Sequence, residues 1–340
     1  MRRFGASVLV LIVAAAVGAP FLAPHAPDQK FSDLLYAPPT LPHLVDDRGG
    51  WHAPFIYPWV LTDRLEQRFE QDRSTRVPLV WLIGGRVVGS SNESTAPLLL
   101  AGADSSGRDV FARLLFGART SLGLALAAAL GATLLGGLVG GAAGYIGGVV
   151  DDALMRATDV VLVLPAIYVV LALRAMMPLV VEPQLVFVML AVIFAVVGAP
   201  FVARGVRAIV RSERQLEYAV AARSLGAGHL RLLVHHLLPA ASGFVIVQLT
   251  VLVPAFIVAE ATLSYVGLGF QDPIASWGAM LQEASNTRAL TDFRWLLSPA
   301  VAIFLVVLGL NLVLQQSGVN PVTISSDESL GRSRADSHTL

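Results

Sequence analysis

The stretch TSLGLALAAALGATLLGGLVGGAAGYIGGVV spans residues 120–150 and contains no Asp, Glu, Lys or Arg. A helix needs roughly 20 apolar residues to cross the hydrocarbon core of a bilayer, and this run is longer. Four other stretches also lack those charged residues, namely 4–27, 183–203, 232–259 and 295–326. The sequence therefore predicts an all-α polytopic membrane protein.

The composition of the whole chain agrees with this fold class. Hydrophobic residues make up 55% of the 340 residues and charged residues 14%, with a mean hydropathy of +0.68. A soluble domain carries about 25% charged residues. The net charge of zero gives no basic signature of nucleic-acid binding. The absence of cysteine excludes disulfides and thiolate metal sites.

We predict six membrane segments. They span residues 4–23, 120–146, 159–178, 184–205, 240–262 and 295–315. Glycines in the second segment would let a neighbouring helix approach closely, as is common for helices that associate in lipid. Pro165 lies inside the third segment, where the missing backbone N–H favours a kink.

The first segment has two interpretations. Arg2 and Arg3 precede an apolar run that ends near Gly18, a pattern that signal peptides share. The run is longer than the 7–15 residues of a typical signal core. We therefore favour a retained membrane anchor helix at residues 1–23.

Arginines in the short loops predict the orientation, because positive residues concentrate on the cytoplasmic side. Arg2 and Arg3 precede the first segment, Arg156 lies between the second and third, and six arginines lie within 204–231. All fall on one side if both termini are cytoplasmic. The sequence thus predicts an extracytoplasmic loop at 24–119 and a five-helix core at 120–315.

The outer loop is predicted to contain a small mixed α/β insertion at residues 44–99. Residues 62–73 favour a short helix, because Leu65 and Phe69 have i, i+4 spacing. Residues 78–89 favour a hairpin with two glycines at its turn. The polar stretch 316–340 has no apolar period and predicts a disordered cytoplasmic tail.

An aromatic cluster also lies in this insertion. It consists of Trp51, Phe55, Tyr57 and Trp59. Three interpretations stay open: rings at the membrane interface, a docking surface for a partner, or a small local core.

The motifs indicate no catalytic, cofactor or metal site. The phosphate-binding loop of ATPases needs Gly-x4-Gly-Lys-Ser/Thr, and the single lysine, Lys30, has no such context. There is no His-Glu-x-x-His pair and no Gly-x-Ser-x-Gly motif. His235 and His236 are adjacent, and adjacent residues on a helix do not share a face, which disfavours a metal site.

Glu260 is the only acid of the fifth predicted segment. Ionisable residues inside membrane segments usually mark function, so Glu260 is a candidate for lining a translocation path. The alternative is a helix-end carboxylate bonded to neighbouring backbone. A self-powered carrier normally buries several acids or histidines in the membrane, and their scarcity argues against one.

The stretch 207–238 is too long for a simple turn and has helical patterning. Its first apolar stripe comprises Tyr218, Ala221, Ala222 and Leu225. Gly226 and Gly228 then interrupt the pattern. The second apolar stripe comprises Leu230, Leu233, Val234 and Leu237. We predict two short amphipathic helices at the membrane surface, which either dock in a groove of another protein or lie on lipid.

Four stretches of the chain resemble one family. They are EYAVAARSLGAGHLRLLVHHLLP at 217–239, GADSSGRDVFARLLFGARTSL at 102–122, GYIGGVVDDALMRATDVVLVLPA at 144–166 and EATLSYVGLGFQDPIASWGAML at 260–281. The first resembles the ATPase-binding loop of permease subunits in binding-protein-dependent ABC importers. The others are similar to the dipeptide, oligopeptide and nickel branch, and the chain looks like the second of its two permease subunits.

The resemblance implies a type I ABC importer permease fold in the bacterial inner membrane. It also implies a homologous permease subunit, two cytoplasmic ATPase subunits that hydrolyse ATP, and an extracytoplasmic solute-binding protein. The coupling positions carried over from the family are Ala221, Ala222, Arg223, Leu225 and Gly226. Val220 departs from the family pattern, which has Glu at that position.

The resemblance does not separate dipeptides, longer peptides and nickel or its chelates as substrates. An ATP-independent channel or carrier is the main alternative function. A membrane-embedded enzyme that uses the acids of the outer loop is a third possibility. The acids Asp63, Glu66 and Glu70 have helical spacing, which is typical of a solvated face.

Overall fold

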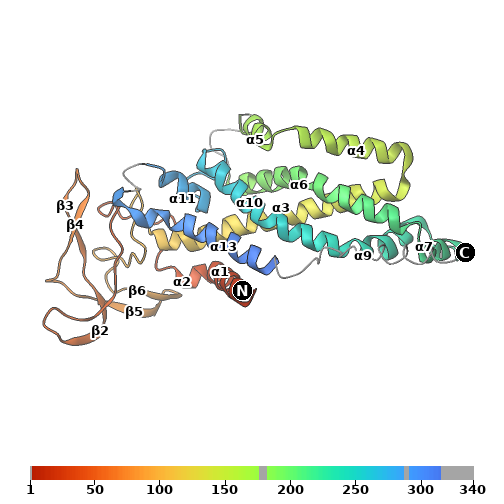
Figure 1. Cartoon of the computed structure of the whole chain (residues 1–340). Coiled ribbons are helices and arrows are strands. Elements are labelled where there is room, and N and C mark those ends of the chain that lie inside the picture. The colour runs from red at the N-terminus through yellow and green to blue at the C-terminus, as the bar shows by residue number, and fades with distance from the viewer. Residues whose placement is uncertain (1, 176–181, 287–290, 315–340) are drawn as a thin grey trace, which may run out of the picture.

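The computed structural model describes residues 2–175, 182–286 and 291–314, so the predicted tail at 316–340 lies outside the described residues. The long helices run side by side, and the strands gather at one end (Figure 1). The helices are α1 Arg2–Val17, α2 Ala19–Leu22, α3 Val110–Ile146, α4 Gly148–Val163, α5 Ala166–Ala175, α6 Pro183–Glu213, α7 Glu217–Ser224, α8 His229–Leu232, α9 Leu238–Ala240, α10 Ser242–Tyr265, α11 Trp277–Glu283 and α13 Ser298–Leu314. A π-helical turn, Leu233–Leu237, precedes α9, and a 3-10 turn, Arg294–Leu297, precedes α13.

Four helices of the described residues are long and apolar enough to cross a membrane. They are α3, α6, α10 and the helix Arg294–Val313. Arg3–Val17 is apolar but shorter, because the chain leaves the helix at Gly18 before α2 begins. The structure therefore confirms a polytopic helical protein.

The third predicted segment differs most from the structure. The helix there begins at Gly148 rather than at 159, and it ends at Val163. Leu164 has an extended backbone and Pro165 follows, as expected because the proline ring disfavours helical geometry in the preceding residue. Helix α5 resumes at Ala166, so this segment is divided rather than continuous.

The predicted insertion is built from strands. They are β1 His43–Val45, β2 Trp51–Ile56, β3 Trp59–Asp63, β4 Arg68–Gln71, β5 Val77–Ile83 and β6 Arg86–Ser90. Strands β1, β2, β5 and β6 form an antiparallel sheet in the order β1-β2-β5-β6, and β3 pairs with β4. The hairpin predicted at 78–89 is confirmed by β5 and β6.

The helix predicted at residues 62–73 is wrong. This stretch forms the β3–β4 hairpin, in which Phe69 pairs with Leu61 across the two strands rather than with Leu65 along a helix. The Asp63 carboxylate accepts hydrogen bonds from the backbone N–H groups of Leu65 and Glu66 at 2.7 and 3.1 Å. Such a local bond stabilises a turn in competition with a helix. Residues 23–109 contain no helix, so the insertion is all β.

The aromatic cluster divides between two environments. Phe55 and Tyr57 are buried, with an edge-to-face ring contact at 5.2 Å between centroids. Trp59 packs beside Phe69 against a small apolar cluster. Trp51 is 79% exposed. Most of the cluster therefore forms a local core.

The largest helix interface joins α3 to α6. Gly136, Gly140 and Gly144 form a stripe at four-residue spacing on α3. A Cβ atom at Gly136 would lie 2.6 Å from the Ala199 carbonyl oxygen, and one at Gly144 would lie 2.6 Å from that of Arg207. Close backbone approach at small residues is a main source of helix association in membranes, where lipid removes the hydrophobic driving force.

We expect Gly140→Ala to destabilise the protein, because its Cβ would overlap the Ala203 backbone. Overpacking of this kind costs about 1–3 kcal/mol. Gly137→Ala is the matched control, since no atom lies within 4 Å of a Cβ at that position. Thermal unfolding in detergent micelles should show a lower midpoint for the first variant only. Equal midpoints would contradict the packing argument.

Candidate functional site

Helix α7 ends in a defined capping motif. Gly226 has φ of +87°, a left-handed conformation that glycine adopts without a steric penalty. The backbone N–H of Ala227 donates to the Ala222 carbonyl, and that of Gly226 donates to the Arg223 carbonyl, both at 3.0 Å. This is the Schellman arrangement, which satisfies the last carbonyls of a helix. It explains why the chain turns sharply before α8.

The surface of α7 and α8 carries apolar side chains that the described residues leave uncovered. Leu225 is 89% exposed and Leu230 is 74% exposed. Ala221 and Arg223 are also exposed, and Ala222 is half-buried. Val220, the departure from the family pattern, lies on the same helix and is exposed. We call Val220, Ala221, Leu225 and Leu230 the α7–α8 face.

An ion pair ties the base of this region to α4. Asp151 of α4 accepts hydrogen bonds from Nε and Nη2 of Arg207, the latter at 2.6 Å. Arg211 Nη1 lies 3.8 Å from the same carboxylate. The Arg207 hydrogen bond lowers the pKa of Asp151, which keeps this carboxylate ionised at neutral pH. The contact fixes the end of α6, from which α7 emerges.

Tyr145 near the end of α3 supplies a second tie. Its hydroxyl lies 2.6 Å from His229 Nδ1 of α8, and its carbonyl accepts a 2.7 Å hydrogen bond from Arg214 Nη1. Tyr218 of α7 donates to the Glu213 carboxylate at 2.6 Å, which raises the pKa of Tyr218 to about 12. Polar contacts therefore join α7 and α8 to the ends of α3 and α6.

Glu260 lies elsewhere, near the end of α10 that faces α11. It is fully buried. Its carboxylate accepts hydrogen bonds from the hydroxyls of Ser121 on α3 and Ser264 on α10, both at 2.8 Å. Both of these partners are serine side chains. The Ser121 hydroxyl oxygen also accepts a 3.2 Å hydrogen bond from the backbone N–H of Trp277. Glu260 therefore joins α3, α10 and the start of α11.

A charge cluster near the strands, in which Asp104, Arg108 and Arg113 are buried, was not singled out from the sequence. Arg108 Nε lies 2.6 Å from Asp104, and its Nη1 lies 2.8 Å from Asp272. Arg113 Nη2 lies 3.4 Å from Asp272. Glu283 accepts a 2.7 Å hydrogen bond from the Ser105 backbone N–H, and burial raises the pKa of its carboxyl.

This charge cluster joins two of the quoted motifs, 102–122 and 260–281. The sequence contained one sign of this cluster: Asp104, Arg108 and Arg113 lie shortly before the charge-free stretch 120–150. Buried charges need partners, so these residues required counterions from elsewhere in the chain. The sequence did not identify which partners they were. The same pairing of motifs recurs where Trp277 Nε1 donates to the Leu114 carbonyl at 3.0 Å.

Within the described residues, no group of three or more His, Cys, Asp or Glu side chains is arranged to hold a metal ion. The site features are a buried carboxylate between helices, a charge cluster at the strand end, and the exposed α7–α8 face. Helix α7 lies at the end of the bundle opposite to the strands (Figure 1). Together with the four helices that are long and apolar enough to cross a membrane, these features belong to a polytopic membrane protein.

Comparison with known families gives the class directly. Residues 132–318 match the binding-protein-dependent transport system inner membrane component family. Residues 1–39 match the N-terminal transmembrane domain of oligopeptide transport permease C. The chain belongs to this family of inner membrane components and is a transmembrane permease subunit.

Relatives are found in several bacteria. The chain is 38% identical over 213 residues to the oligopeptide transport system permease protein of Bacillus subtilis, covering 62% of this chain and 67% of the relative. It is 40% identical over 213 residues to a dipeptide transport system permease protein of the same species, covering 62% and 64%. It is 30% identical over 310 residues to a di/tripeptide transport system permease protein of Pseudomonas aeruginosa, covering 91% and 83%.

We expect Glu260→Ala to destabilise the protein by about 2–4 kcal/mol, because two buried serine hydroxyls lose their acceptor and a cavity remains. Glu260→Gln keeps the volume and one acceptor oxygen, so its loss should be smaller. Glu217→Ala, at an exposed acid of α7, is the control. Thermal unfolding in micelles measures all three. A wild-type midpoint for Glu260→Ala would exclude the bridging role.

Proposed function

We propose that this chain forms half of the translocation path of an ATP-driven importer and receives work from a separate ATPase. The observation that carries the proposal is the α7–α8 face, which exposes leucines while polar contacts tie its helices to α3 and α6. Exposed apolar side chains on a short helix are typical of docking in a groove of another protein. The coupling positions are Ala221, Ala222, Arg223, Leu225 and Gly226.

We further propose that the α7–α8 end is cytoplasmic and the strands are extracytoplasmic, in a bacterial inner membrane. The arginines of residues 204–231 support this orientation through the positive-inside rule. The partners would be a homologous permease, two ATPase subunits that hydrolyse ATP, and a solute-binding protein at the strand end. The chain itself would need no cofactor.

The substrate class we propose is short peptides or a related small solute. The relatives are named as permeases for oligopeptides, dipeptides, di/tripeptides and, in Pectobacterium atrosepticum, glutathione. Glu260 is the candidate for lining the path, because it is an acid within a spanning helix. Because its carboxylate is buried, Glu260 would act through the serine side chains of α3 and α10 that it binds.

The alternative is an ATP-independent channel or carrier. Such a protein would move solute in vesicles that lack both ATP and an ATPase. An unpartnered apolar face at one end of the molecule would have no role in it. We therefore favour the importer.

Leu225→Asp tests the proposal. We expect it to abolish co-purification of the ATPase subunits and to reduce ATP-dependent uptake at least tenfold, because a charge would enter an apolar docking groove. Leu65→Asp is the matched control, since Leu65 is 86% exposed on the insertion and Leu225 is 89% exposed at the C-terminal cap of α7. Both side chains are exposed, so neither change should alter folding.

Normal ATPase binding and normal uptake by the Leu225→Asp protein would refute the coupling role. Solute uptake without ATP in purified vesicles would favour the channel or carrier instead. The midpoint of thermal unfolding of both variants should equal that of the wild-type protein.

A further inference from the structure

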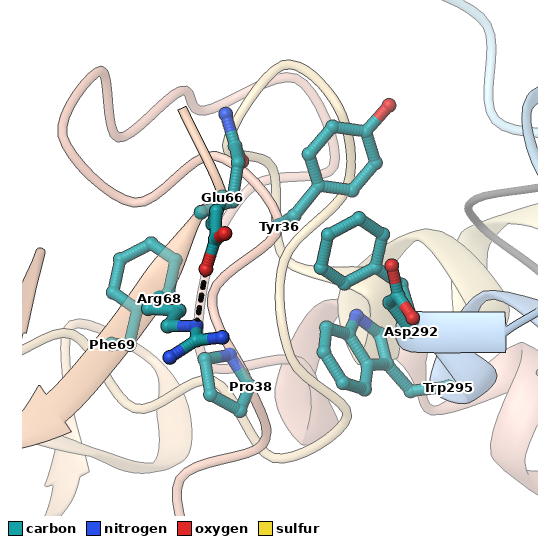
Figure 2. A pocket seen from close by; sticks show the side chains of 9 residues that line it. Tyr36, Pro38, Glu66, Arg68, Phe69, Asp292 and Trp295 are labelled. Atoms are coloured by element: carbon teal, nitrogen blue, oxygen red, sulfur yellow. Dashed lines mark ion pairs between the residues drawn. The ribbon is translucent and has the colours of Figure 1, made fainter. Parts of the chain in front are cut away.

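A cavity of about 570 Å³ lies where the insertion meets the helical bundle (Figure 2). Three segments far apart in sequence form it: residues 36–38, the β3–β4 turn, and the start of the 3-10 turn before α13. Its size is within the range of small-molecule sites, about 300–1,000 Å³. Neither the residues of the α7–α8 face nor Glu260 line this cavity.

One wall of this cavity is aromatic. The rings of Tyr36 and Phe293 stack with centroids 4.4 Å apart and an angle of 12° between planes. Trp295 continues the wall, 5.5 Å from Phe293. Its indole Nε1 donates to the Ala103 carbonyl at 3.0 Å, which fixes the ring. The wall is thus a rigid apolar surface for a ligand side chain.

The opposite wall carries charge. Arg68 Nε lies 2.6 Å from the Glu66 carboxylate. Figure 2 shows the guanidinium beside the Glu66 carboxylate and pointing across the gap towards Trp295. Asp292 contributes a second carboxylate beside the aromatic wall. The cavity therefore combines one cation, two carboxylates and several rings.

The backbone at this cavity is strained. Tyr36 has φ of +58° and Gln67 has φ of +55°, and both residues line the cavity. Among the described residues, Leu82 is the one other non-glycine residue with a left-handed backbone conformation. Left-handed backbone is unfavourable for residues with a side chain, and such residues concentrate at ligand sites, where the surrounding structure holds them in place. Tyr36 and Gln67 both line the cavity, and the Tyr36 ring stacks on Phe293.

We propose that this cavity binds a short zwitterionic peptide with an apolar side chain. Its carboxylate would pair with the Arg68 guanidinium, whose planar donors match a carboxylate. Its ammonium would lie near Asp292 and Glu66, and its side chain would lie on the aromatic wall. The proposal rests on the proposed function for the outward orientation and for peptides as solutes.

The test is binding of phenylalanyl-leucine to the full-length chain in lipid nanodiscs, followed by ligand-observed NMR without ATP or ATPase. We expect saturable binding that weakens at least tenfold for Arg68→Gln and for the C-terminal amide of the peptide. N-acetylation of the peptide should also weaken binding. Arg64→Gln is the matched control, because Arg64 is an exposed arginine of the same turn that does not line the cavity.

Absence of binding to the wild-type chain would overturn the proposal. So would equal binding of free and doubly blocked peptide, or equal affinity of the wild-type and Arg68→Gln proteins. The changes to the peptide keep the test valid even if Arg68→Gln disturbs the hairpin. ATP-dependent uptake without cavity binding would refute this site alone, whereas cavity binding without ATPase docking would refute the coupling role alone.

Discussion

Backbone contact between α3 and α6 is the constraint on which the rest of the structure depends. Lipid gives apolar helices no hydrophobic reason to associate, so close van der Waals packing must supply the energy. Gly136, Gly140 and Gly144 lie on successive turns of α3 and allow the α6 backbone to pack directly against them. Any side chain there would separate the helices. The two helices therefore form a single rigid element.

This rigid element connects the two ends of the molecule. At the strand end, α3 begins beside the charge cluster of Arg108 and Asp272, and Ser121 on the same helix holds Glu260. At the other end, Tyr145 holds α8 and accepts the Arg214 side chain. A displacement of α8 would thus act on the same helix that contacts the sites at the strand end. Helix α3 is continuous from Val110 to Ile146.

The sequence predicted what depends on local pattern. Charge-free runs identified α3, α6 and α10, and the Gly226 interruption marked the end of α7. Prediction from the sequence failed where contacts between distant residues determine the structure. Leu65 and Phe69 suggested a helix, but the Asp63 turn and pairing with Leu61 produced strands instead. The Arg108–Asp272 pair and the cavity between Tyr36, Arg68 and Trp295 join residues more than thirty positions apart, and no local periodicity encodes such contacts.

The polar character of the ties at α7 bears on how this region can work. Apolar packing holds one side of this region, because Ala219 is buried in the main core and Ala222 packs against it. Asp151, Tyr145 and Glu213 add oriented hydrogen bonds at its ends, and the α7–α8 face stays uncovered. A docked partner would bury that face without competing with the ties. In the proposed coupling role, the exposed face would bind the ATPase, and the polar contacts would transmit its movement to α3 and α6.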